Sequence, residues 1–130
     1  MNLLDTYLTR SVFSSYDDMK ENLKVKIPEN FNFAYDVVDH IAAVEPSREA
    51  LVWCDDSGND ARFTFGDMKR LSDRAASVFS KYGIRRGDPV MLVLKGRYEF
   101  WICLLALHKL GAVAIPATHM LTVKDYVYRV

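Results

Sequence analysis

The sequence holds little cysteine, and the cysteines it has lie far apart. Its 130 residues include two of them, Cys54 and Cys103, each inside an apolar segment. Two isolated cysteines provide neither a disulfide framework nor the ligands of a metal site. We therefore expect two reduced, buried thiols and no bound metal.

An excess of charge and a long apolar run are also absent. Lys plus Arg and Asp plus Glu number 17 each, so the formal net charge is zero, which argues against nucleic acid or an acidic membrane surface as a partner. The longest apolar stretch, Phe100–Leu107, is far shorter than the ~20 residues of a membrane span. Residues 1–10 contain an acid and no long apolar run, so the sequence predicts neither a signal peptide nor a transit peptide. We therefore expect a cytoplasmic protein.

Glycine-rich motifs that bind phosphate groups are missing. There is no Gly-x-x-x-x-Gly-Lys-Ser/Thr sequence and no Gly-x-Gly-x-x-Gly after a strand, and the six glycines are scattered at turns. Gly96 separates an apolar segment from an expected helix, a position where anions can bind. A single glycine nevertheless favours a simple turn over a phosphate site.

The three histidines share no spacing typical of metal ligands, and no Ser–His–Asp arrangement is evident. His40 and His108 fall on expected helices and are interpreted as structural or exposed. His119 follows the end of an expected strand, and α/β sheets place their binding sites at the carboxyl ends of parallel strands. His119 is therefore a candidate site residue, while no catalytic residue is identified.

The first half of the chain predicts helices and a hairpin. Residues 1–30 are expected to form a lead-in of one or two short helices. Asn32 is positioned to cap a helix that ends near Val44, because apolar residues recur there at helical spacing. Residues 51–54 and 62–65 flank a turn rich in Asp, Gly and Asn, which predicts a β-hairpin.

Thr64 and Asp67 resemble a capping box and predict the start of a helix that Gly83 ends. The apolar stripe expected on this helix consists of Met68, Leu71, Ala75, Val78, Phe79 and Tyr82. A stripe at this spacing predicts a helix that packs one side against the core.

The second half predicts a strand over 90–94, a buried helix over 98–110 that Gly111 stops, and a strand over 112–115. Strand, helix and strand make a right-handed βαβ crossover of a parallel sheet, because a strand that is apolar on both faces needs helices on both sides. The sequence thus predicts an α/β fold, with a parallel sheet flanked by helices plus a hairpin. Thr122 is expected to cap a last helix in which the chain ends, which suggests a truncated domain over 31–130.

Three segments together resemble one known family, the AMP-forming acyl-CoA synthetases of the acyl-adenylate-forming superfamily. Phe63–Met68 is similar to its T-Y/F-x-E-L helix start, and Gly83–Val90 to its G-x-x-x-G-D-x-V strand entry. His108–Pro116 is similar to its G-A-V-x-x-P motif. The segments Phe31–Asp39 and Leu121–Asp125 resemble the branch that acts on short- and medium-chain fatty acids.

The resemblance implies a partial large N-terminal domain of an enzyme that uses ATP, Mg²⁺ and coenzyme A to activate a small carboxylate. It places His119 and Met120 on the coenzyme A side of that enzyme. Met120 stands where many medium-chain relatives have Gln, and Asp67 replaces their usual Glu. The segment Lys95–Arg97 lacks the proline that many relatives carry before their Glu-Phe or Glu-Trp pair.

The family's phosphate loop, its ribose-binding Asp and its catalytic Lys would lie beyond Val130. The chain alone is therefore expected to be an inactive, structural part of a ligase, with the remainder of a parent chain as its partner and no cofactor of its own. Its uncovered apolar elements predict self-association. The alternative interpretation is a self-sufficient small α/β binding or interaction module.

Overall fold

A computed structural model of the chain describes residues 3–129. It divides into two compact units, Met1–Phe31 and Asn32–Val130, and each is described by itself. The expected division into a lead-in of residues 1–30 and an incomplete domain of residues 31–130 stays a prediction. Among the described residues, no helix combines the length and the apolarity that a bilayer crossing demands.

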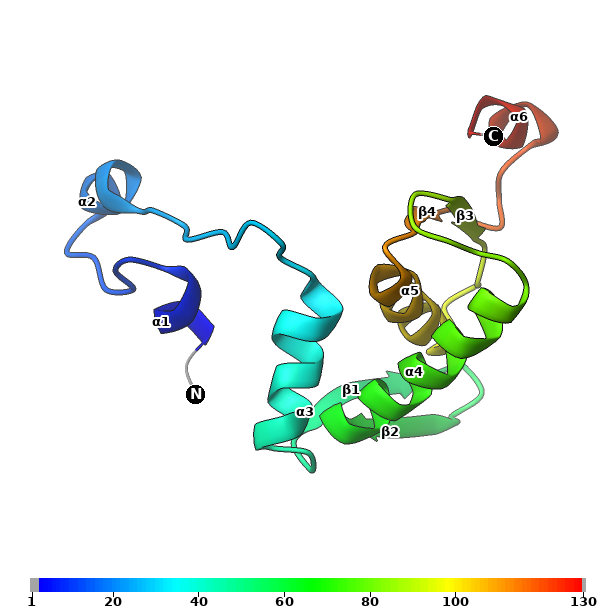
Figure 1. Ribbon diagram of the computed structural model, residues 1–130, viewed down its shortest axis with the longest axis horizontal. Coiled ribbons are helices and arrows are strands. Elements are labelled where there is room, and N and C mark those ends of the chain that lie inside the picture. Colours follow the sequence, from blue (N-terminus) through cyan, green and yellow to red (C-terminus); the bar gives the residue numbers. More distant parts are fainter. Residues whose placement is uncertain (1–2, 130) are drawn as a thin grey trace. The chain divides into compact units, whose positions relative to one another are not determined.

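The first unit contains two short helices, α1 (Leu3–Tyr7) and α2 (Tyr16–Asn22), drawn in blue in Figure 1. Ser15 caps α2, since its side chain accepts a hydrogen bond from the backbone N–H of Asp18. An isolated antiparallel bridge joins Leu8 to Val25.

The second unit begins with one helix whose first part is wound as a π-helix, η1 (Ala34–Asp39), and whose second part is α3 (His40–Val44). The Asn32 side-chain oxygen accepts a hydrogen bond from the N–H of Ala34 at 3.0 Å. The helix expected between Asn32 and Val44 is thus present, with a wider first turn.

The predicted hairpin is formed by β1 (Glu49–Cys54) and β2 (Asp60–Thr64), which pair antiparallel. Gly58 sits in its turn with a φ of 81°. Both cysteines are free, as expected, but Cys54 is exposed rather than buried. The reason is that a two-stranded hairpin packs one face on the core and leaves the alternate side chains in solvent.

Helix α4 (Phe65–Lys81) starts at the predicted capping box. Thr64 Oγ1 accepts from the N–H of Asp67, and Asp67 Oδ2 accepts from the N–H of Thr64, both at 3.1 Å. The predicted apolar stripe is wrong at its end, because Val78 is 48% and Tyr82 is 85% exposed.

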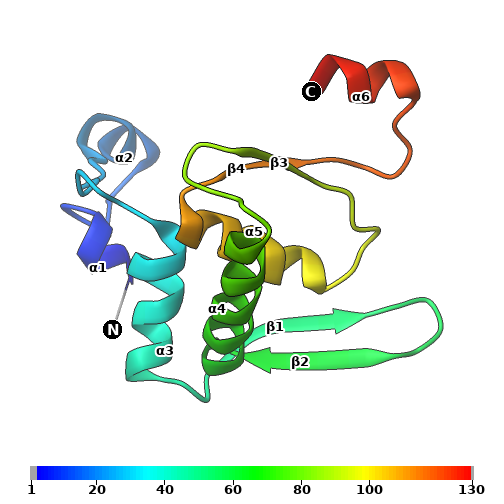
Figure 2. The ribbon, with the colours of Figure 1, turned by 45° about the vertical axis from the view of Figure 1, so that its right-hand side comes forward.

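The parallel pair consists of β3 (Pro89–Leu92) and β4 (Val113–Pro116), connected through α5 (Glu99–Leu110). Gly111 ends α5 in the left-handed conformation with a φ of 69°. A last helix, α6 (Val123–Arg129), follows Thr122, and its expected continuation at Val130 lies outside the described residues. The α/β prediction is confirmed, with two small two-stranded sheets and flanking helices (Figure 2).

Helix α5 joins two apolar clusters into one core. Ile102 and Leu105 pack with Ala34, Val38 and Met68 near the hairpin. The second cluster lies under the parallel strands and contains Leu92, Leu107 and Ala112. This packing fixes the hairpin, α4 and the strands β3 and β4 around a single central helix.

Candidate functional site

The strands β3 and β4 end level with each other, so the loops that follow them leave from the same side. Leu92 pairs with Pro116, and the N–H of Ala117 donates to the carbonyl of Leu92 at 3.0 Å. We call this side the carboxyl edge, defined by the loops of residues 93–98 and 117–122. In α/β sheets such an edge is the usual place for ligands.

The loop of residues 117–122 carries the two site residues that the sequence singled out. His119 and Met120 lie in a turn and are both exposed, Met120 to 78%. The N–H of Met120 donates to Thr118 Oγ1 at 3.3 Å. Both side chains therefore face solvent at the carboxyl edge.

The loop of residues 93–98 is fastened to the hairpin. The indole Nε1–H of Trp53 donates to the carbonyl of Gly96 at 2.6 Å. The Arg97 guanidinium carbon lies 5.4 Å from the Trp53 ring centroid and 5.5 Å from that of Tyr98. Arg97 also donates to both carboxylate oxygens of Glu99, at 2.9 and 3.1 Å, which holds the pKa of Glu99 below its usual range. We call this arrangement the Trp53–Arg97 clamp.

Gly96 itself adopts a φ of 58°, in the left-handed region that glycine tolerates best. Its carbonyl is occupied by Trp53. The interpretation of Gly96 as a turn residue rather than a phosphate site fits this geometry. The close spacing of Arg97 and Glu99 is consistent with their ion pair, but no sequence pattern predicts the contact of this loop with Trp53.

The remaining histidines stand apart from the carboxyl edge. His40 begins α3 and is exposed. His108 lies on α5, where its Nδ1 is buried without a hydrogen-bond partner among residues 3–129, and burial lowers its pKa. Over the same residues, no group of three His, Cys, Asp or Glu side chains converges as a metal site.

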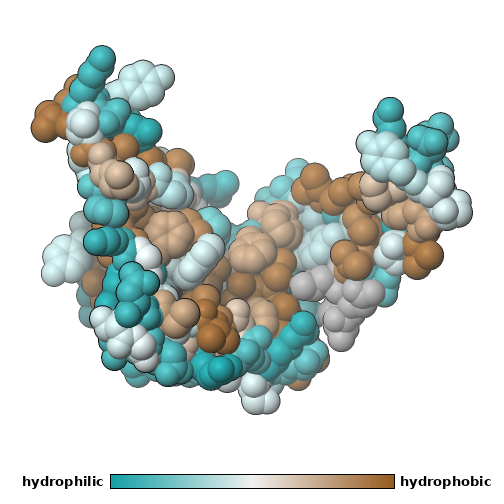
Figure 3. Space-filling model, turned by 180° about the vertical axis from the view of Figure 1, so that it is seen from behind, coloured by the Kyte–Doolittle hydropathy of each residue, from teal (hydrophilic) through white to brown (hydrophobic). Residues whose placement is uncertain are grey.

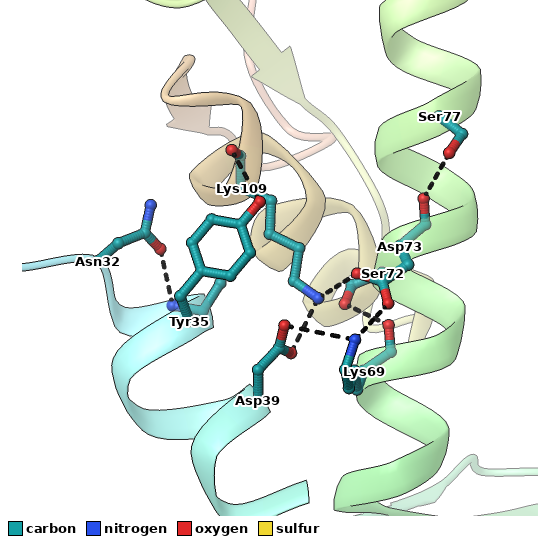
Figure 4. A network of polar contacts seen from close by, with 9 residues as sticks. Asn32, Tyr35, Asp39, Lys69, Ser72, Asp73, Ser77 and Lys109 are labelled. Atoms are coloured by element: carbon teal, nitrogen blue, oxygen red, sulfur yellow. Dashed lines mark hydrogen bonds and ion pairs between the residues drawn. The ribbon is translucent and has the colours of Figure 1, made fainter. Parts of the chain in front are cut away.

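A polar network joins three helices on another side of the unit (Figure 4). The Lys109 ammonium lies 2.9 Å from Asp39 Oδ1 and 2.6 Å from Asp73 Oδ1, and its side chain is only 3% exposed. Lys69 reaches Asp73 at 2.7 Å and Asp39 at 3.7 Å. Tyr35 covers the ammonium, with its ring centroid 5.7 Å from Lys109 Nζ. We call these residues the Lys109 network.

The charges in this network balance one another. Burial would raise the pKa of Asp73, but hydrogen bonds from Lys109 and Lys69 outweigh it and lower that pKa. The hydrogen bond to Asp73 raises the pKa of Lys69 in turn. Because every charge has a partner of opposite sign, the network acts as a cross-link between η1, α4 and α5.

An apolar pocket of about 340 Å³ opens between the hairpin and α5. Phe33 and Trp101, which are 47% and 51% exposed, belong to its lining. The rest of the lining is Val38, Ala50, Leu51, Phe65, Met68, Leu104, Leu105 and His108. Figure 3 shows apolar side chains gathered at the surface of the molecule.

Comparison with known proteins identifies relatives over most of the chain. Residues 38–130 match the family described as AMP-binding enzyme. "Acyl-coenzyme A synthetase ACSM3, mitochondrial" from Mus musculus is 38% identical over 123 residues, and its counterpart from Homo sapiens is 39% identical over the same length. Each match covers 90% of this chain but 21% of the relative.

Solved structures share the fold. The N-terminal domain of FACL13 from Mycobacterium tuberculosis, bound to an inhibitor, aligns with a TM-score of 0.66 and 31% sequence identity. The alignment covers 75% of this chain and 23% of that domain. The Mycobacterium tuberculosis fatty acyl CoA synthetase aligns with the same TM-score and identity, over 18% of its own length.

The comparisons correct one expectation and support another. The prediction of a cytoplasmic protein is wrong, because the relatives are named as mitochondrial enzymes. That prediction depends on the composition of residues 1–10 alone, which does not decide the compartment of a protein. The expected resemblance, in contrast, is confirmed: this chain belongs to the family of AMP-binding enzymes and corresponds to an N-terminal part of the acyl-CoA synthetases within it.

Proposed function

We propose that this chain supplies the scaffold of the large domain in an acyl-CoA synthetase. The parent enzyme would activate a short- or medium-chain carboxylate with ATP and transfer the acyl group from the adenylate to coenzyme A. The observation that carries this proposal is the family match over residues 38–130, together with relatives whose names include acyl-coenzyme A synthetase. The chain spans 21% of those relatives, so it would contribute framework rather than the reacting groups.

ATP and Mg²⁺ are not assigned to residues 3–129. Those residues hold no glycine-rich phosphate loop and no converging set of three metal-binding side chains. We therefore propose that other segments of a parent enzyme bind the triphosphate and its metal ion.

For coenzyme A we propose the carboxyl edge, with His119 and Met120 as contacts. Both side chains are exposed in the loop that follows β4. The Met120 thioether offers apolar contact to a pantetheine arm but no strong hydrogen bond. In a full-length synthetase that contains this chain, the His119→Ala and Met120→Ala variants should each bind coenzyme A more weakly than wild type in a calorimetric titration, and unchanged affinity in both would contradict the assignment.

A ligase assay tests the scaffold role. The isolated chain, incubated with ATP, Mg²⁺, coenzyme A and octanoate, should yield no acyl-CoA by liquid chromatography. A full-length relative such as the human enzyme is the positive control. Formation of acyl-CoA above the rate without enzyme would refute the view that the chain is only a scaffold.

Stability measurements separate this role from that of an independent binding module. A self-sufficient module should be monomeric and unfold in urea with one cooperative transition. A scaffold with uncovered apolar elements should instead associate with itself. Size-exclusion chromatography and urea melts at several protein concentrations distinguish the two, because only the associating chain gains stability with concentration.

A further inference from the structure

The carboxyl edge is basic. The loops of residues 93–98 and 117–122 contain Lys95, Arg97 and His119 but no Asp or Glu. Two carboxylates border the loops: Glu99 pairs with Arg97, and Asp125 accepts from the N–H and the hydroxyl of Thr122. A cation left without such a partner would favour an anionic ligand over a neutral or cationic one.

The charge of Arg97 is already paired with a carboxylate. Arg97 forms a salt bridge of 2.9 Å with Glu99. Lys95 differs, since it is exposed and pairs with no carboxylate among the described residues. Of the two cations in the loop of residues 93–98, Lys95 is therefore the one available to bind an anionic ligand.

The loop that carries Lys95 is held in place. Trp53 binds the carbonyl of the next residue, Gly96, and Arg97 lies over the aromatic rings of Trp53 and Tyr98. The loop that carries His119 is tied to the same edge by the hydrogen bond from Ala117 to Leu92. A fixed loop loses less conformational entropy when a ligand binds it.

We propose that Lys95 anchors a phosphate group of coenzyme A at the carboxyl edge, and that the Trp53–Arg97 clamp positions it. This inference rests on the proposed function, which supplies the ligand. Coenzyme A joins phosphate groups to an apolar thiol-bearing arm, and the edge offers a cation at Lys95 with an exposed thioether at Met120. A Lys–phosphate contact is a charge-assisted hydrogen bond that weakens with salt.

The test compares three ligands by isothermal titration at low salt, on a full-length synthetase that contains this chain. They are coenzyme A, pantetheine, which lacks the phosphates, and ATP, which lacks the thiol arm. We expect Lys95→Gln to weaken coenzyme A binding about tenfold. Pantetheine binding should not change. Lys81→Gln removes the same charge from α4 and should leave both affinities as they are.

A second variant isolates the clamp. Trp53→Phe keeps a ring but deletes the indole donor to Gly96, so coenzyme A affinity should fall less than in Lys95→Gln, again without loss for pantetheine. Circular dichroism melts establish that each variant is folded.

Each outcome separates this inference from the proposed function. Wild-type affinity of Lys95→Gln for coenzyme A overturns the role of Lys95 and leaves the coenzyme A assignment intact. An equal loss for ATP and coenzyme A shows a general phosphate site and overturns the choice of coenzyme A. Failure of the wild-type full-length protein to bind coenzyme A overturns the coenzyme A assignment and the role of Lys95 with it, while the scaffold role is tested separately by the ligase assay.

Discussion

His108 is a buried titratable group whose Nδ1 has no hydrogen-bond partner among residues 3–129. Burial lowers its pKa below the ordinary value of 6.5, because a charged imidazole loses hydration there. The unfolded chain therefore takes up a proton before the folded chain does as pH falls below 6.5. Folding stability should be full above that pH and should decrease as the solution is acidified.

The measurement is the urea midpoint of unfolding at a series of pH values from neutral down to the range where carboxylates titrate. His108→Leu removes the titrating group and keeps an apolar side chain of similar size in the pocket lining. This variant should lose the part of the pH dependence that begins near neutrality. A wild-type midpoint that does not move over this interval would show that His108 is neutral or solvated in both states.

Residue-scale features were predictable from the sequence where local chemistry decides them. The Thr64–Asp67 box and the stop at Gly111 depend on neighbours within a few residues, and both are present. The Trp53–Arg97 clamp depends on a contact across more than forty positions, so no local rule indicates it. The ion pairs of Lys109 could not be predicted for the same reason, since their carboxylates, Asp39 and Asp73, lie on two other helices.

Lys109 of α5 joins η1 and α4 through its ion pairs with Asp39 and Asp73. Its removal should therefore destabilise the packing of all three helices. Lys109→Met would leave Asp39, only 14% exposed, without its nearest cation. We expect a loss of about 3 kcal/mol, at the low end for broken buried ion pairs because Lys69 still neutralises both carboxylates. Urea unfolding measures the loss.

Two further variants distinguish the loss of the buried charge from other effects of the substitution. Lys81→Met removes an exposed lysine from α4 and should change stability by less than about 0.5 kcal/mol. The double variant Lys109→Met with Asp39→Leu also removes the Asp39 carboxylate that has lost its nearest cation. It should recover part of the lost unfolding free energy. No recovery would mean that the Lys109 stem contributes through packing rather than through its charge.

The start of α4 offers a second test at the level of elements. Thr64→Ala deletes the side chain that accepts from the N–H of Asp67 and should cost about 1 kcal/mol. Thr64→Ser keeps the hydroxyl and should stay close to wild type. Thermal melts followed by circular dichroism compare the two, and equal losses would assign the effect to the threonine methyl group instead of the cap.

Element boundaries were less predictable than element types. The apolar run over 90–94 predicts a strand to its end, yet β3 stops at Leu92. Its partner β4 ends level with it at Pro116, and the following residues turn toward the Trp53–Arg97 clamp. Strand length is thus decided by the partner strand and by a distant tryptophan, which the apolar pattern does not contain.

At the scale of the whole molecule, the parallel pair is covered less completely on one face than on the other. Val90, Leu92 and Ala114 pack with the second apolar cluster, to which Leu107 of α5 belongs. Side chains alternate along a strand, so Met91, Val113 and Ile115 lie on the opposite face, where Met91 and Ile115 are half-buried. Val113 is 52% exposed, and Val93, which follows β3, is 37% exposed. We call this the open face, and parallel strands are normally buried on both sides.

We propose that two copies of the chain associate through the open face, because burial of its apolar side chains is favourable. Val113→Lys places a charge at its most exposed position and should shift the population toward monomer in sedimentation velocity over a concentration series. Val52→Lys makes the same change on the hairpin, where Val52 is 48% exposed, and should leave association as in wild type. A wild-type chain that stays monomeric throughout would refute self-association. Equal effects of the two lysines would place the contact elsewhere, since a charge confined to the hairpin cannot disturb an interface built on β3 and β4.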